Sequence, residues 1–135
     1  MKPGLQTIRA LSRLWNEELL RGEEPSLWRL GDLLDDFRQR CATLEEKEAL
    51  VSESPVWLDV KKNADINAYL AAVAETLCRE VSLPPPAWTE SPLCYLHRPW
   101  FAGGFEMLKA LLLVESPVAF RRRNLFVSAN ALSRA

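Results

Sequence analysis

Apolar residues recur at steps of three and four positions through the first part of the chain, the spacing that lines one face of an α-helix. The pattern predicts one helix over residues 5–21 and a second from Ser26 to Cys41. Gly22 lies between them, and glycine adopts the left-handed turn that ends helices at little cost. We therefore expect a helical hairpin in which Ser26 caps the second helix.

Two more helices are predicted before the proline-rich part of the chain begins. Thr43 followed three positions later by Glu46 is a reciprocal capping pattern, and it predicts a short helix over residues 43–52. The clearest apolar stripe extends from Asp65 to Val81, with alanines at the tighter positions. We expect this fourth helix to be capped by Asp65 and to lie at the centre of the core.

The connector that follows is rich in proline and aromatic residues. Because each proline removes a backbone donor and restricts the residue before it, we expect no helix over residues 83–92. We interpret this segment as a stiff spacer with Trp88 packed into the core. The alternative is an extended recognition segment for an aromatic-groove domain.

The last part of the chain returns to a helical pattern. Helix is predicted from about residue 106 to Glu115, followed by a short helix, an extended stretch over residues 125–127 and a last turn capped by Ser128. The expected fold is an all-α, compact single-domain helical bundle with a short extended segment near the C-terminus. Its parts are a helical body (1–82), a Pro/aromatic connector (83–105) and a basic C-terminal helical segment (106–135) within one domain of residues 1–135.

Charge is distributed unevenly along a chain of otherwise ordinary globular composition. The 135 residues are 48% hydrophobic and 26% charged, with a formal net charge of −1, which fits one folded domain. Residues 1–90 carry 16 acids and 11 bases, whereas residues 91–135 carry 2 acids and 6 bases. A basic end on an acidic body indicates directional electrostatics, toward either a polyanion or an acidic partner surface.

The N-terminal segment does not read as a targeting sequence. It carries Arg9, Arg13, Glu17 and Glu18, so it lacks the uninterrupted apolar core of a signal peptide. No run of residues approaches the roughly eighteen consecutive apolar positions needed to span a bilayer. We therefore expect a cytoplasmic protein.

The sequence contains no recognisable catalytic or metal-binding constellation. Cys41, Cys78 and Cys94 are widely spaced, and only one histidine accompanies them, so we expect buried, reduced, structural thiols rather than a disulfide framework or a zinc site. His97 follows Cys94 by three residues, but a nucleophile pair also needs a third group to orient the base. We expect a structural or surface histidine.

Asp32 and Asp36 are spaced to share one face of a helix. Paired carboxylates perform acid–base chemistry or hold magnesium. Here Arg29 and Arg40 lie within helical reach of the two aspartates, so we expect a solvated charged face instead.

The sharpest polar feature is the run Arg121-Arg122-Arg123. Guanidinium groups suit carboxylates and phosphates alike, and Phe120 and Phe126, which flank the run, are candidates for stacking on bases. Three interpretations stay open: internal structural bonds, contact with a protein partner, and contact with nucleic acid.

Three ordered blocks between Pro84 and Ala135 carry a family resemblance. They are Pro86–Thr89 (Pro-Ala-Trp-Thr), Arg98–Phe101 (Arg-Pro-Trp-Phe) and Glu115–Val127. In these blocks the chain resembles a bacterial family of small antitoxin-like proteins that are found beside nucleotidyltransferase-type toxin genes. The resemblance implies an antitoxin or regulator.

We therefore expect a non-catalytic, antitoxin-like binding protein that neutralises a partner enzyme, such as a nucleotidyltransferase toxin, by direct contact. Such a protein needs no catalytic residue, metal or cofactor, and its basic end would steer the encounter. A nucleic-acid-binding transcriptional regulator that uses the basic C-terminal segment is the alternative, and an enzyme comes third. The candidate partner-binding residues are Trp88, Arg98, Trp100, Phe101, Arg121, Arg122 and Arg123.

Overall fold

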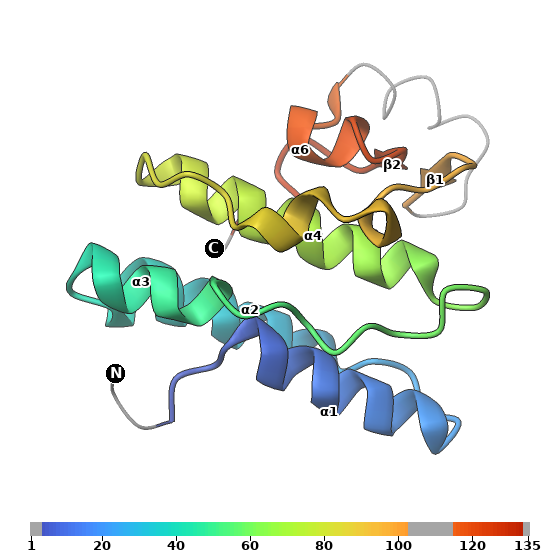
Figure 1. Ribbon diagram of the computed structural model, residues 1–135, viewed down its shortest axis with the longest axis horizontal. Coiled ribbons are helices and arrows are strands. Elements are labelled where there is room, and N and C mark those ends of the chain that lie inside the picture. The colour runs from blue at the N-terminus through green and yellow to red at the C-terminus, as the bar shows by residue number, and fades with distance from the viewer. Residues whose placement is uncertain (1–3, 103–114, 134–135) are drawn as a thin grey trace.

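The computed structural model describes residues 4–102 and 115–133. Most of the described chain is helical, and α4 crosses the middle of the molecule, with α1, α2 and α3 on one side and α6, β1 and β2 on the other (Figure 1). The helices are α1 (Ile8–Leu20), α2 (Leu27–Asp35), a π-helical continuation of α2 (Asp36–Arg40), α3 (Leu44–Val51), α4 (Ala64–Glu80) and α6 (Val118–Arg121). The strands are β1 (Trp100–Phe101) and β2 (Leu125–Phe126).

The sheet corrects the expected all-α class. β1 and β2 pair in parallel, with Trp100 opposite Leu125 and Phe101 opposite Phe126. The extended stretch predicted near the C-terminus thus exists, but its partner is in the connector, where no strand was expected. Each strand is only two residues long because the ladder joins two loop segments rather than forming a layer of its own.

The predicted hairpin is confirmed, and Gly22 ends its first helix as expected. Gly22 has a φ of +77° and donates its N–H to the carbonyl of Leu19 at 3.0 Å, while Glu23 donates to Glu18 at 2.9 Å. This pair of bonds is the Schellman arrangement, which satisfies the last carbonyls of a helix. The chain can then reverse direction into α2.

The predicted capping residues have mixed outcomes. Thr43 accepts a bond from the N–H of Glu46 at 3.1 Å, which confirms the cap of α3. Ser26 does precede α2, but its hydroxyl donates to the carboxylate of Glu18 and makes no capping bond. Asp65 is wrong as a cap, because α4 begins at Ala64 and the capping position belongs to Asn63. Asp65 instead lies in the first turn, where its negative charge complements the helix dipole.

The connector contains more regular structure than its prolines led us to expect. Residues 83–92 were expected to be free of helix, yet 3₁₀ turns form at Ala87–Glu90 and Pro92–Cys94. They form because Ala87–Glu90 contains no proline, and because proline is tolerated at the first position of a turn, where no N–H is required. Trp88 is tucked inward as predicted, and its indole N–H donates to the carbonyl of Val51 at 2.8 Å.

The tail folds back onto the connector. Asn124 adopts the left-handed conformation, with a φ of +65°, and its side-chain amide donates to the carbonyl of Leu96 at 2.8 Å. The predicted last turn forms, but the hydroxyl of Ser128 donates to the side chain of Asn130 and so caps nothing. The helix predicted from about residue 106 falls almost entirely on residues 103–114, outside the described residues.

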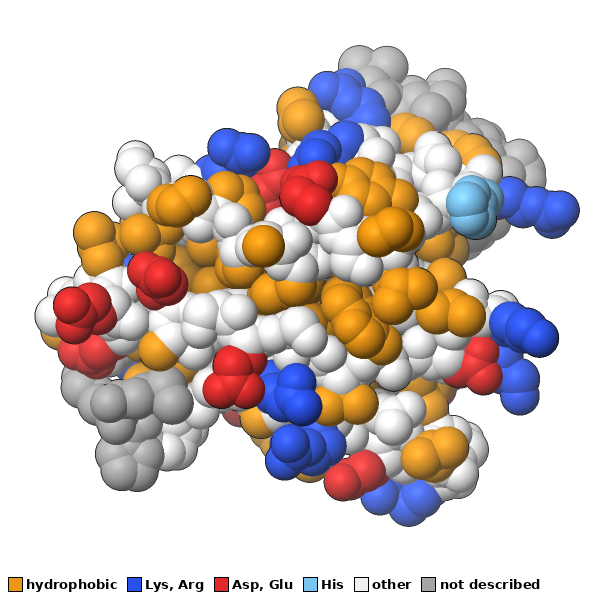
Figure 2. Space-filling view, in the orientation of Figure 1, with side chains coloured by type: hydrophobic (Ala, Val, Ile, Leu, Met, Phe, Trp, Pro, Cys, Tyr) orange, Lys and Arg blue, Asp and Glu red, His pale blue; other side chains and the backbone are white. Residues whose placement is uncertain are grey.

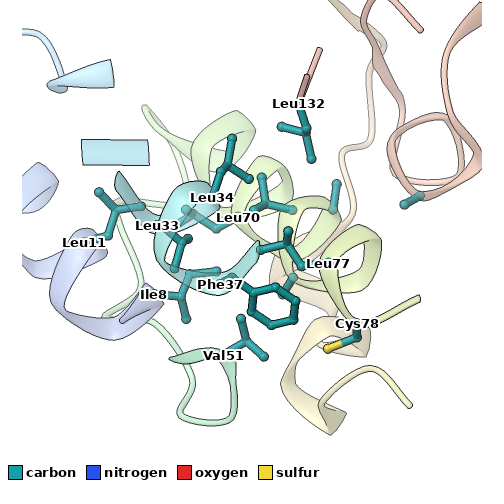
Figure 3. Close-up of a cluster of buried hydrophobic side chains, with 14 of the residues drawn as sticks. Ile8, Leu11, Leu33, Leu34, Phe37, Val51, Leu70, Leu77, Cys78 and Leu132 are labelled. Carbon is teal, nitrogen blue, oxygen red and sulfur yellow. The ribbon is translucent and has the colours of Figure 1, made fainter. Parts of the chain in front are cut away.

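A single cluster of buried apolar side chains extends from Ile8 to Leu132, and α4 contributes more to it than any other element described. Figure 3 shows side chains of α1, α2 and α4 pointing toward one another in this cluster. Four alanines of α4 are fully buried, namely Ala68, Ala71, Ala72 and Ala74, so neighbouring segments approach its backbone closely. This confirms the predicted central position of α4. No helix in the described parts of the chain has the length and hydropathy to cross a bilayer.

Asp36 does not lie on the solvated face that the sequence had predicted. Its side chain is only 6% exposed, because it accepts the backbone N–H of Gln6 at 2.6 Å and pairs with Arg40. The expected pairing with Arg40 is therefore correct, but the carboxylate fastens the segment before α1 to the end of α2. Asp32 remains partly exposed.

Candidate partner-binding site

The arginine run separates into three different environments. Arg123 is fully buried, although arginine is among the residues least often buried. Its guanidinium donates to Oε1 of Glu75 at 2.6 Å, to the carbonyl of Ala119 at 2.7 Å and to the carbonyl of Thr89 at 3.1 Å. These bonds join α4, the connector and α6, so Arg123 has a structural role and offers no surface to a partner.

Arg122 lies at the edge of the same cluster, with its side chain 34% exposed. It donates to Oε1 of Glu75 at 2.7 Å and makes a two-pronged contact with the carboxylate of Glu90 at 3.0 Å. Its guanidinium also lies 5.5 Å from the centre of the Tyr95 ring, and the Tyr95 hydroxyl donates to Glu90. Arg122 is thus held in place yet remains accessible from one side.

Glu75 is the carboxylate around which these contacts are organised. Burial by itself would raise the pKa of Glu75, but hydrogen bonds from Arg123, Arg79 and Arg122 outweigh burial and hold the pKa at about 2. Glu75 is therefore ionised at neutral pH, as a partner of three guanidinium groups must be. Nothing in the sequence around Glu75 distinguishes it from a core-facing position of α4, so sequence reasoning missed it.

Positive charge remains in excess around this cluster. Three arginines contact two carboxylates: Arg79, Arg122 and Arg123 against Glu75 and Glu90. Arg121, which directly precedes Arg122, is exposed, and its side chain makes no hydrogen bond or ion pair with the described residues. In Figure 2 basic side chains lie beside and above an acidic one in the upper half of the face shown.

A cleft between α4 and α6 borders these arginines. It has a volume of about 600 Å³, and its walls include Arg79, Val118 and Arg122. Two carboxylates also line it: Glu75, which the arginines contact, and Glu80, which pairs with Arg38. Val118 is 62% exposed, and Arg121 follows it by one helical turn. We call the surface formed by Arg79, Val118, Arg121 and Arg122 the basic face. On this face three arginine side chains lie near the exposed apolar side chain of Val118.

The aromatic candidates of the connector are mostly engaged inside the protein. Trp88 meets Trp57 edge to face, with ring centres 6.1 Å apart, and Phe101 stacks on Phe126 at 5.0 Å. Trp100 is half-buried in β1 and packs against the core. Arg98, the remaining candidate of the connector, is exposed on the segment before β1. The predicted site residues are therefore not brought together on one surface.

The phenylalanines that flank the arginine run are not available to bases. Phe120 is fully buried and meets Tyr69 edge to face at 5.0 Å. Phe126 is 7% exposed and is covered by Phe101. The idea that these two rings stack on nucleic-acid bases is therefore wrong.

Cys94 and His97 have no geometry of a nucleophile and its base. The Cys94 thiol is fully buried and donates to the carbonyl of Trp88 at 3.5 Å, and burial raises its pKa to about 11. His97 is exposed. Cys41 and Cys78 are buried as well and form no disulfide, in agreement with the buried, reduced thiols predicted for all three cysteines.

Metal ligands are not clustered in the part of the chain that the structure describes. No group of three or more histidine, cysteine, aspartate or glutamate side chains is arranged there to hold an ion.

A second candidate surface is an apolar groove of about 500 Å³, which the sequence did not reveal. It lies at the start of α4, at the end of that helix away from α3. The end of α1, the start of α4 and β1 all lie on this side, at the right of Figure 1. Its walls come from five separate segments, so no local pattern could have predicted it. The lining residues are Trp15, Glu24, Pro25, Leu27, Leu30, Asp65, Ile66, Tyr69, Trp100, Ala102 and Val127.

Comparisons with known proteins do not add a relative. No known protein family matches the sequence, no curated protein is significantly similar to it, and no solved structure is significantly similar to the fold. The resemblance to antitoxin-like proteins therefore stays a prediction that rests on the three C-terminal blocks.

Proposed function

We propose that this protein is a non-catalytic, antitoxin-like binding protein that neutralises a partner enzyme by direct contact through the basic face. The observation that carries the proposal is the excess of guanidinium groups over carboxylates that contact Glu75, beside the exposed Arg121, whose side chain has no ion-pair partner among the described residues. A partner with an acidic surface would complete the charge balance that the fold leaves open.

The basic face suits a carboxylate-rich surface for geometric reasons. Arg122 is already oriented by Glu75 and Glu90, so little side-chain entropy would be lost when it meets a further carboxylate. Val118 adds apolar area next to the charges. The metal and nucleotide sites of nucleotidyltransferases are acidic, which makes a toxin of that class the partner that the C-terminal resemblance favours.

Nucleic-acid binding is the second candidate, because Arg98 and Arg121 are both exposed and phosphate suits the same guanidinium groups. This candidate now lacks the aromatic platform that single-stranded binding uses, since Phe120 and Phe126 are covered. Only backbone contacts would remain, and these would weaken steeply as the salt concentration rises.

The experiment pairs growth rescue with direct binding. The enzyme encoded by the gene beside this one is co-expressed with the wild-type protein or with Arg121→Glu, and the affinity of the purified proteins is measured by calorimetry. Arg121→Glu should weaken binding by about tenfold or more and reduce rescue, because it reverses the charge on the basic face. Arg13→Glu is the matched control, since Arg13 is an exposed arginine of α1 outside this face.

Equal rescue by both variants would exclude the basic face as the binding surface. Wild-type binding to duplex DNA or single-stranded RNA at low salt, with no binding to the enzyme, would establish the second candidate instead. Melting temperatures of the variants should match the wild type, because both arginines are exposed.

A further inference from the structure

Three large apolar side chains are exposed at the tip of the α1–α2 hairpin. Leu20 is 80% exposed, Leu27 is 73% exposed and Trp28 is 62% exposed. All three lie within nine residues of one another at the hairpin connection, and Leu27 also forms part of the wall of the apolar groove. Exposed apolar groups gathered in this way mark a surface that another molecule covers.

The groove beside the tip has a distinctive chemistry. Three of its lining side chains are aromatic, namely Trp15, Tyr69 and Trp100. Two more, Glu24 and Asp65, are carboxylates, and no lysine or arginine is among the described lining residues. The groove therefore joins aromatic rings to negative charge, the combination that attracts a cation within an apolar setting.

The polar groups of this groove are also incompletely used inside the protein. The indole N–H of Trp15 donates to the carbonyl of Ser26 at 2.9 Å, which fixes the ring against the hairpin connection. The hydroxyl of Tyr69 and the indole N–H of Trp100, by contrast, make no hydrogen bond with the described residues. These groups would accept or donate bonds to the backbone of a bound segment.

We propose that the groove and the hairpin tip bind a segment of a partner protein in which a lysine or arginine is flanked by apolar residues. The apolar residues cover Leu27 and the part of Trp28 that the Arg29 guanidinium, 4.4 Å from the centre of the Trp28 ring, leaves open. The cation enters the groove, faces the aromatic rings and pairs with Glu24 and Asp65. Charge complementarity argues for this occupant, because an acidic or purely apolar segment would leave two carboxylates beside it without a counter-charge. The basic face, with its opposite charge, plays no part in this contact, so the two proposals can fail separately.

The test selects ligands from a phage-displayed library of random peptides of about twelve residues against the full-length protein. Selected peptides should be enriched in lysine or arginine next to leucine, phenylalanine or tryptophan. The proposal is overturned if no peptide is enriched, or if the enriched peptides are acidic.

Matched variants then locate the binding surface. Leu27 and Leu44 are exposed leucines at the first position of α2 and of α3, but only Leu27 lines the groove. Leu27→Ser should weaken binding of a synthetic selected peptide by about tenfold or more, and Leu44→Ser by less than about twofold. Equal effects of the two substitutions would place the peptide elsewhere.

A second pair tests the charge. Glu24 lines the groove, whereas its neighbour Glu23 does not and pairs with Arg21 instead. Glu24→Lys should weaken peptide binding more than Glu23→Lys does, and the difference should narrow at high salt. Both glutamates are exposed, so neither substitution should lower the melting temperature appreciably. Unchanged affinity for Glu24→Lys would refute the cation pairing.

Discussion

Glu75 and Arg123 form a buried ion pair between α4 and the turn after α6. Nη1 of Arg123 lies 2.6 Å from Oε1 of Glu75, and the two side chains are 0% and 4% exposed for Arg123 and Glu75 respectively. A charge pair this deep in a protein is costly to separate, because neither group can recover its hydration. This contact therefore fastens the C-terminal part of the chain to the central helix.

The three adjacent arginines should differ sharply when each is replaced by alanine. Arg123→Ala leaves Glu75 with a weakened set of partners and the carbonyls of Ala119 and Thr89 without a donor, so we expect a loss of about 3–5 kcal/mol in the free energy of unfolding. Arg121→Ala should change it by less than about 0.5 kcal/mol. Urea denaturation followed by tryptophan fluorescence measures both, and similar values for the two variants would contradict the burial of Arg123.

Stability should fall in acid because of Glu75. Its pKa is about 2 in the folded protein against an ordinary value of 4.5, so its contribution is fully present above about pH 4.5 and is lost as the pH falls toward 2. A shift of this size corresponds to a contribution on the order of 3 kcal/mol. The free energy of unfolding of the wild type should therefore decrease more steeply between pH 4.5 and 2 than that of Glu75→Gln, because the glutamine side chain has no carboxylate to protonate.

The comparison requires a variant that folds at neutral pH. Glu75→Gln keeps the shape of the side chain and one accepting oxygen, although its NH2 group cannot accept from an arginine. Circular dichroism at pH 7 therefore verifies that the variant is folded before the acid titration. Parallel pH curves for the two proteins would show that other carboxylates dominate acid unfolding.

The cysteines should be unreactive in the folded protein. Burial raises the pKa values of Cys78 and Cys94 to about 11, so at pH 8 only about one thiol in a thousand is a thiolate. Reaction with a chromogenic disulfide reagent should be at least about a hundredfold slower for these thiols than in urea, where they are exposed. A thiol at either position that reacts as fast in buffer as in urea would show that the segment around it opens readily.

The sequence by itself determined the features that depend on neighbours within about four positions. The four helices before the connector, the stop at Gly22 and the cap at Thr43 were all predicted, because helix hydrogen bonds and capping bonds join residues that are close along the chain. The capping role of Asp65 was assigned wrongly, since several polar residues lie near that helix start and local patterns place boundaries poorly.

Only the tertiary structure decided what the arginine run does. Arg121, Arg122 and Arg123 are identical in chemistry and adjacent in sequence, but the chain turns between them, so one faces solvent, one a cleft edge and one the core. Their carboxylate partner Glu75 is 48 positions from Arg123 and became a partner only when α4 and α6 packed together. The apolar groove was equally invisible, because packing alone brings its five separate wall segments side by side.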